Sequence, residues 1–74
     1  MKKIFNEKDY LIDIFDNNVY IKNYVLIKEI SYNKIRIILV NNIIDLRGNN
    51  LIIAKLDEKE LLIKGELKGI DFIE

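Results

Sequence analysis

The chain has 74 residues, with twelve basic and twelve acidic side chains and neither cysteine nor histidine. A chain of this length forms one domain with a small core, and here disulfides and the common zinc sites are excluded as reinforcement. The balanced charge argues against a dedicated binder of nucleic acid or anionic membranes, because such proteins carry a basic excess.

The residue composition favours strands and turns. Sixteen isoleucines and nine asparagines occur without any proline; isoleucine suits pleated strands and asparagine suits turns. Apolar runs such as residues 37–40 reach only four residues, too short to cross a bilayer, and no signal-peptide core follows the N-terminal lysines. We therefore expect a cytoplasmic protein without direct membrane insertion.

We expect residues 1–9 to form an N-terminal tail, either disordered or a short helix, because the apolar residues near it also fit helical spacing. Residues 10–15 also fit a strand, with Tyr10, Ile12 and Ile14 on one face, and a turn at residues 16–18 joins it to the next strand. Residues 10–74 are expected to form a single domain.

Farther along the chain, apolar residues occupy every second position and turn residues recur every nine or ten positions. The expected turns lie at residues 31–34, Asn41-Asn42, Gly48-Asn49-Asn50 and residues 57–60. This spacing predicts an all-β protein, a small antiparallel β-sandwich or roll of about six to seven short strands.

The C-terminal segment changes the parity of its alternation between Leu67 and Ile70. Side chains in a strand change face at every residue, so both halves of the segment can face one core only if the chain contains an irregularity. We predict a β-bulge or tight bend at Lys68-Gly69, because glycine makes such an irregularity sterically cheap. The glycines with expected roles in turns or bulges are Gly48, Gly65 and Gly69.

Several apolar side chains are expected on the strand face opposite the core. A solvated sheet face is mostly polar, so these residues indicate an interface with a protein partner or a second copy, unless the sheet coils over them. Two tyrosines alternate with Lys22 and are expected on one strand face. Such a face can bind a protein, or it can stack single-stranded nucleic acid, which the neutral net charge makes less favoured. The candidate interface residues are Ile38, Val40, Ile52, Leu62, Tyr20 and Tyr24.

The residues available for catalysis are few. Ser31 is the only serine, lies in an expected turn and has no histidine to activate it. The acids at residues 57–60 lack the spacing of a calcium loop, and Gly48 is not followed by the helix that a phosphate loop requires. We expect no enzymatic activity, no cofactor and no metal.

Four segments in order carry a resemblance to a known family. They are residues 21–27, residues 35–37, the apolar-x-apolar-x-Gly-x-x-Leu element around Gly48, and the Gly-x-apolar-x-x-Ile-x-Phe ending at residues 65–72. Together they make residues 11–73 resemble the YabP/YqfC family of sporulation proteins. Tyr24 stands where the YqfC branch tends to show histidine, and Leu26 where glycine is frequent, so the branch stays open.

The resemblance implies a small β-sandwich, a role in endospore formation in the mother cell of a Gram-positive bacterium, and no known enzymatic activity. Family members are commonly encoded beside a sporulation membrane protein, which implies a membrane-protein partner, a peripheral location through it, and an interaction role that includes homo-oligomers. A competing resemblance is to Sm-like RNA-binding proteins, whose first motif is similar to residues 65–72, although the strands that follow it in that fold are absent here.

Overall fold

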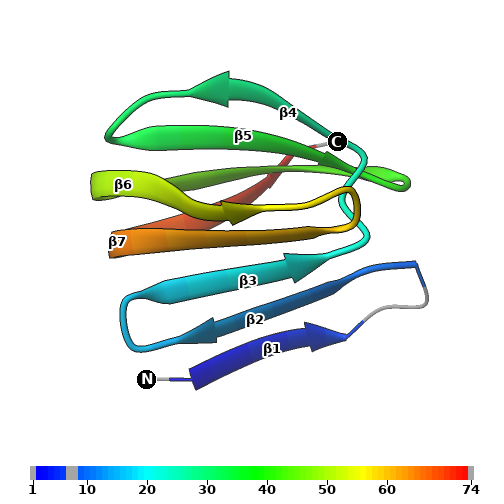
Figure 1. The fold of residues 1–74 in the computed structure, drawn as a ribbon, viewed down its shortest axis with the longest axis horizontal. Coiled ribbons are helices and arrows are strands. Elements are labelled where there is room, and N and C mark those ends of the chain that lie inside the picture. Colours follow the sequence, from blue (N-terminus) through cyan, green and yellow to red (C-terminus); the bar gives the residue numbers. More distant parts are fainter. Residues whose placement is uncertain (1, 7–8, 74) are drawn as a thin grey trace.

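The structure is a computed structural model that describes residues 2–6 and 9–73. This part of the chain forms seven strands and no helix, so no helix of it could span a membrane. Figure 1 shows how the strands are arranged. The strands are β1 (Lys2–Asn6), β2 (Leu11–Phe15), β3 (Asn18–Lys22), β4 (Leu26–Ile30), β5 (Lys34–Leu39), β6 (Asn42–Leu56) and β7 (Glu60–Ile73).

All seven strands belong to one antiparallel sheet, in the order β1-β2-β3-β7-β6-β5-β4. This confirms the expected all-β antiparallel fold. β6 and β7, with 15 and 14 residues, are nearly three times as long as the five-residue strands β1 to β4, and both turn back on themselves at the same side of the molecule (Figure 1). The bends fold the sheet into two layers.

The register shows which strand segments form each layer. In the first layer, residues 60–64 of β7 pair with β3 on one side and with residues 52–56 of β6 on the other. In the second layer, residues 43–47 of β6 pair with residues 69–73 of β7, and residues 42–47 pair with β5. The two halves of each long strand therefore serve different layers.

Backbone irregularities produce the bends. Asn50 and Gly65 have positive φ angles of 54° and 138°. Arg47 pairs with Gly69 and Gly48 pairs with Leu67, which leaves Lys68 as an extra residue in β7. This two-against-one pairing is a β-bulge, and it returns both Leu67 and Ile70 to the core side.

Short loops hold the bends in place through backbone hydrogen bonds. Asn33 and Tyr32 accept from the N–H groups of Gly48 and Leu51, at 3.0 and 2.8 Å. Asn17, in the turn between β2 and β3, accepts from Gly65 N–H at 3.1 Å. The N–H groups of Gly48, Leu51 and Gly65 at the bends therefore have hydrogen-bond partners outside the strand pairing.

The core lies between the two layers and consists almost entirely of alternate residues from the strands. Isoleucine and leucine dominate because branched side chains pack well on a pleated surface. The fully buried members are Ile12, Ile21, Ile35, Ile37, Ile44, Leu46, Leu61 and Ile63.

Three local expectations differ from the structure. Residues Lys2–Asn6, expected in a tail or short helix, form β1, because β2 offers an open antiparallel edge. The expected turn at Gly48-Asn49-Asn50 lies inside β6, which bends there without leaving β7. The hairpin expected at Asn41-Asn42 is shifted by one residue: Leu39 pairs with Asn42, and Asn41 takes the positive φ.

Candidate functional site

A row of four apolar side chains crosses the outer face of the second layer. Leu26 pairs with Ile38, Ile38 with Ile43, and Ile43 with Ile73, so one residue comes from each strand. Directly paired residues lie on the same face of a sheet and contact one another. We call these residues the outer row: Leu26, Ile38, Ile43 and Ile73.

The alternation of each strand explains why the outer row points away from the core. Ile37 and Leu39 are buried on β5, which turns Ile38 outward, and Ile44 is buried on β6, which turns Ile43 outward. Leu26 is exposed and the other three are half-buried. The expectation that Ile38 points away from the core is confirmed.

Val40 extends the same surface. It lies in the turn after β5 and is exposed. Beside it, a shallow groove of about 280 Å³ is lined by Ile38, Leu39, Asn41, Asn42, Ile43 and Ile73. The apolar area therefore continues to the end of the layer.

The remainder of this outer face is charged, and its charges neutralise one another. Arg36 donates to both carboxylate oxygens of Asp45, at 2.7 and 2.9 Å, and Lys34 lies 3.5 Å from the same carboxylate. Lys34 also lies 3.7 Å from Glu29, and Arg47 pairs with Asp71. The face carries three basic and three acidic groups in mutual contact.

Asp45 is a charged residue that is buried. The hydrogen bonds from Arg36 hold the pKa of its carboxyl below the usual range; burial opposes this, and the charges of Arg36 and Lys34 add to the lowering. The ionised carboxylate is thus a fixed part of the outer face.

The outer face of the first layer holds three other expected interface residues. Tyr20 pairs directly with Leu62, while Ile52 is exposed one row away, beside Lys64. The Tyr20 hydroxyl donates to Glu60 at 2.8 Å, and this hydrogen bond is the main cause that raises the pKa of Tyr20. These residues are separated from the outer row by the thickness of the molecule.

Tyr24 does not share a face with Tyr20, contrary to expectation. β3 ends at Lys22 and Asn23 adopts a φ angle of 66°, which breaks the alternation. Tyr24 is half-buried against the core, and its hydroxyl donates to the Asp57 carbonyl oxygen. The expected aromatic and basic platform is therefore reduced to Tyr20 and Lys22.

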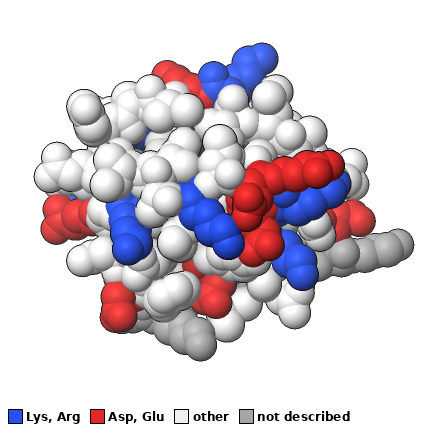
Figure 2. Space-filling model, in the orientation of Figure 1, with Lys and Arg blue, Asp and Glu red and all other residues white. Residues whose placement is uncertain are grey.

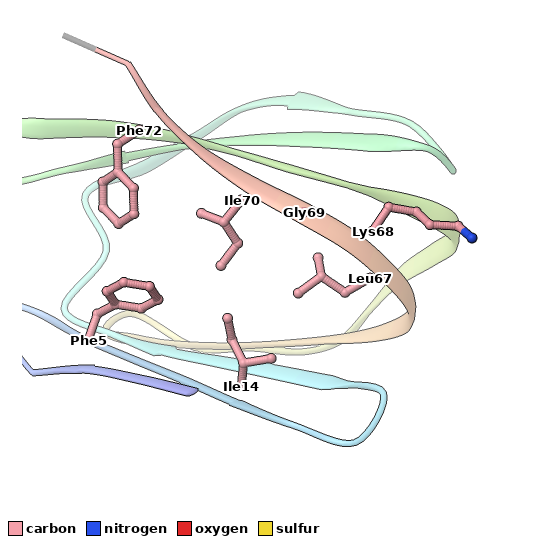
Figure 3. Close-up of a pocket in the computed structure, with 7 residues that line it drawn as sticks. All are labelled: Phe5, Ile14, Leu67, Lys68, Gly69, Ile70 and Phe72. Atoms are coloured by element: carbon pink, nitrogen blue, oxygen red, sulfur yellow. The ribbon is translucent and has the colours of Figure 1, made fainter. Parts of the chain in front are cut away.

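A pocket of about 160 Å³ lies at the end of the core, between the layers (Figure 3). Phe5 of β1 and Phe72 of β7 close one side of it, with ring centroids 5.4 Å apart and planes tilted by 59°. Ile14, Leu67 and Ile70 also line the pocket, and the amino group of Lys68 points away from it. Its lining offers apolar contact but no converging polar groups, which binding sites for polar ligands require.

The residues considered for catalysis are dispersed in the structure. Ser31 lies in the turn between β4 and β5, where its hydroxyl oxygen accepts from Lys34 N–H at 3.1 Å and bonds to Asn33. Asp57 pairs with Lys55 and Glu60 accepts from Tyr20. In residues 2–6 and 9–73, no three acidic residues gather as a metal site would need.

Three of the four outer-row residues were missed by sequence reasoning. Leu26, Ile43 and Ile73 join Ile38 only through the cross-strand register, which alternation within one strand does not reveal. One signal in the sequence could have found Ile43. It directly precedes Ile44, which is a core position, and adjacent residues of a strand point to opposite faces. Comparison with known proteins adds no further guide, since no family model, no curated protein and no solved structure matches the chain.

Proposed function

We propose that the protein is a small binding module that attaches to a protein partner through the outer row and has no catalytic role. The observation that carries the proposal is the continuous apolar row on a face that is otherwise charged. Exposed contiguous apolar area rimmed by polar groups is typical of protein interaction surfaces.

The electrostatics of the surface favour a protein over a nucleic acid as partner. The charged groups beside the outer row form ion pairs with one another, and Figure 2 shows acidic and basic side chains interspersed on the face in view. Nucleic-acid affinity depends on cations that neutralise phosphates. Cations already paired with Asp45 and Asp71 offer little net charge for that purpose.

We further propose a role in spore formation, in the mother cell, with a sporulation membrane protein as partner. The resemblance of residues 11–73 to YabP/YqfC proteins supports this role, and the apolar outer row supplies a surface for such a partner. Peripheral attachment to a membrane would then follow from the partner, and self-association through the same surface is compatible with it.

Deleting the gene in the source organism and counting heat-resistant spores tests the biological role. We expect fewer heat-resistant spores, rescue by the wild-type gene, and no rescue by an Ile38→Thr/Ile43→Thr gene whose product is equally abundant. Normal spore counts in the deletion strain would rule out the sporulation role. Equal rescue by the double variant would instead rule out the outer row as the functional surface.

A further inference from the structure

A second surface lies where the folded sheet does not close. β4 is the edge strand at one end of the sheet, and residues 52–56 of β6 pair only with β7, so both present an unpaired edge. No Cα atom of β4 lies within 8 Å of a Cα atom of β6. Paired strands lie about 4.8 Å apart, so the two edges are not paired with each other and their backbone groups stay open to an additional strand.

The opening is lined by apolar side chains that are exposed to an unusual degree. A groove of about 470 Å³ lies between the end of β4 and the bend of β6, lined by Ile30, Ser31, Tyr32, Leu51, Ile52 and Ile53. Ile30, Tyr32 and Ile52 are 62%, 73% and 52% exposed. We call this feature the seam groove.

Exposed apolar residues concentrate along these two edges. Ten large apolar side chains are exposed in the part of the chain whose side chains are described, and six of them lie on the two edges or directly beside them: Val25, Leu26, Ile30, Tyr32, Ile52 and Leu56. The upper left of Figure 2, over β4 to β6, is correspondingly poor in charged groups.

Both edges carry features that oppose pairing with a second copy. The register of β4 skips Lys28, and the register of β6 skips Ala54, so each edge contains a bulge. Lys28 and Lys55 are exposed on the two edges. The lysines oppose pairing with a second copy, because that copy would bring the same positive charges to the edge.

The charge that is not compensated near the groove is positive. Lys28 forms no ion pair with any described residue, and neither does Lys64, which pairs in register with Ile52. The acidic residue of β4, Glu29, lies 3.7 Å from Lys34 and is already neutralised. A partner with acidic residues would complement Lys28 and Lys64.

We propose that the seam groove binds an extended segment of another protein in which apolar and acidic residues alternate, added as a strand along the edge of β6. Strand addition uses backbone hydrogen bonds for affinity and alternate side chains for specificity. The apolar side chains would lie on the core side of the added strand, against Ile30, Tyr32 and Ile53, and the acidic ones would lie on its outer side and face Lys28 and Lys64. The inference names a partner chemistry for the binding module proposed above and rests on that proposal.

A peptide titration tests the inference. The probe is a fluorescein-labelled octapeptide, Glu-Ile-Asp-Val-Glu-Leu-Asp-Val, and a second peptide replaces each acidic residue by lysine. Fluorescence anisotropy is expected to give micromolar binding of the acidic peptide and at least about tenfold weaker binding of the lysine peptide. Chemical-shift changes in ¹⁵N spectra should concentrate at residues 28–32 and 51–55.

Two matched variants locate the binding. Ile30→Ser should weaken the binding of the acidic peptide at least about fivefold. Ile4→Ser, which removes a comparably exposed isoleucine from β1, should leave the affinity within about twofold of wild type. Absence of binding up to about 1 mM, equal affinity for both peptides, or insensitivity to Ile30→Ser would overturn the inference. A wild-type dimer in sedimentation equilibrium that Ile30→Ser dissociates would show that a second copy occupies the groove, which also overturns it.

The result separates the two proposals. Failure of peptide binding while outer-row variants still lose their partner would leave the binding module intact and remove only the seam groove. Peptide binding together with unaltered partner retention by outer-row variants would support the seam groove and rule out the outer row as the partner surface.

Discussion

Gly65 of β7 lies directly against the backbone of Asn50 in β6, where the two long strands bend together. A Cβ atom on Gly65 would lie 2.6 Å from the Asn50 carbonyl oxygen and 2.9 Å from the Leu51 Cα atom, and the φ angle of Gly65 is 138°. Both the contact and the dihedral angle exclude a side chain at this position. The folding of one sheet into two layers therefore depends on this glycine.

Gly65→Val should lower the free energy of unfolding by roughly 1–3 kcal/mol, since the backbone must shift to admit the side chain. Urea denaturation followed by circular dichroism measures the change. Gly69→Ala is the control, because a Cβ there meets mainly the end of the flexible Arg47 side chain, and the exposed Arg47–Asp71 pair contributes little. Equal losses in the two variants would show that the bend does not depend on Gly65.

Asp45 is expected to contribute to stability in a pH-dependent manner. Its folded pKa is lowered, so its contribution is complete above the ordinary aspartate pKa of about 4 and is lost as the pH falls through the lower folded value. Asp45→Asn should destabilise by about 1–2 kcal/mol at neutral pH, because Arg36 and Lys34 lose a charged partner and are partly open to solvent.

The measurement is urea denaturation of both proteins between pH 7 and pH 2.5. The difference in the free energy of unfolding between wild type and Asp45→Asn should shrink toward the acid end of this range. Asp71→Asn, which removes a half-exposed partner of Arg47, should show a difference below about 0.5 kcal/mol. If the difference in the free energy of unfolding between wild type and Asp45→Asn does not change with pH, the lowered pKa of Asp45 is contradicted.

Neighbouring isoleucines on β5 should differ sharply in their importance for folding. Ile37 is fully buried and Ile38 belongs to the outer row, although they are adjacent in sequence. Ile37→Thr should cost about 2–5 kcal/mol, because it leaves a cavity and buries a hydroxyl group. Ile38→Thr, which keeps the β-branched shape, should cost less than about 1 kcal/mol. Similar losses in urea denaturation would mean that the outer row is core.

Local alternation was sufficient to predict the all-β class and the strands β2, β3 and β5, because each buries every second residue. In β4 only Ile27 is half-buried, and the strand was predicted from its apolar residues alone. Alternation was insufficient for β1, whose charged and apolar residues fit two periodicities. The bulge region at Lys68-Gly69 was detectable as a change of parity. The order of the strands was not, since pairing between β3 and β7 joins residues that lie 38 or more positions apart in the sequence.

The candidate site was predicted only in part, because alternation shows which face a residue lies on but not which strands pair. Ile38, Val40 and Ile52 could be placed outside the core from parity within their own segments. Tyr24 could not, because a single positive φ angle at Asn23 turns it away from Tyr20. Ile30 and Tyr32 of the seam groove gave no signal, since their exposure results from how the folded sheet ends.

RNA binding should be absent. The cations beside the outer row are engaged with Asp45 and Asp71, and Tyr20 and Tyr24 do not form one stacking face. An electrophoretic shift with oligouridine at low salt should show no saturable complex below about 100 μM protein, since ionic contacts dominate such binding. Saturable micromolar binding would favour an Sm-like function instead.

Partner retention by the outer row tests the central claim most directly. Immobilised wild type, Ile38→Thr/Ile43→Thr and the control Ile4→Thr are each exposed to extract of the source organism, and bound proteins are quantified by mass spectrometry. All three should show the same β circular dichroism, and the double variant should lose at least one protein about fivefold or more that the other two retain. Identical sets of bound proteins on all three would contradict the account.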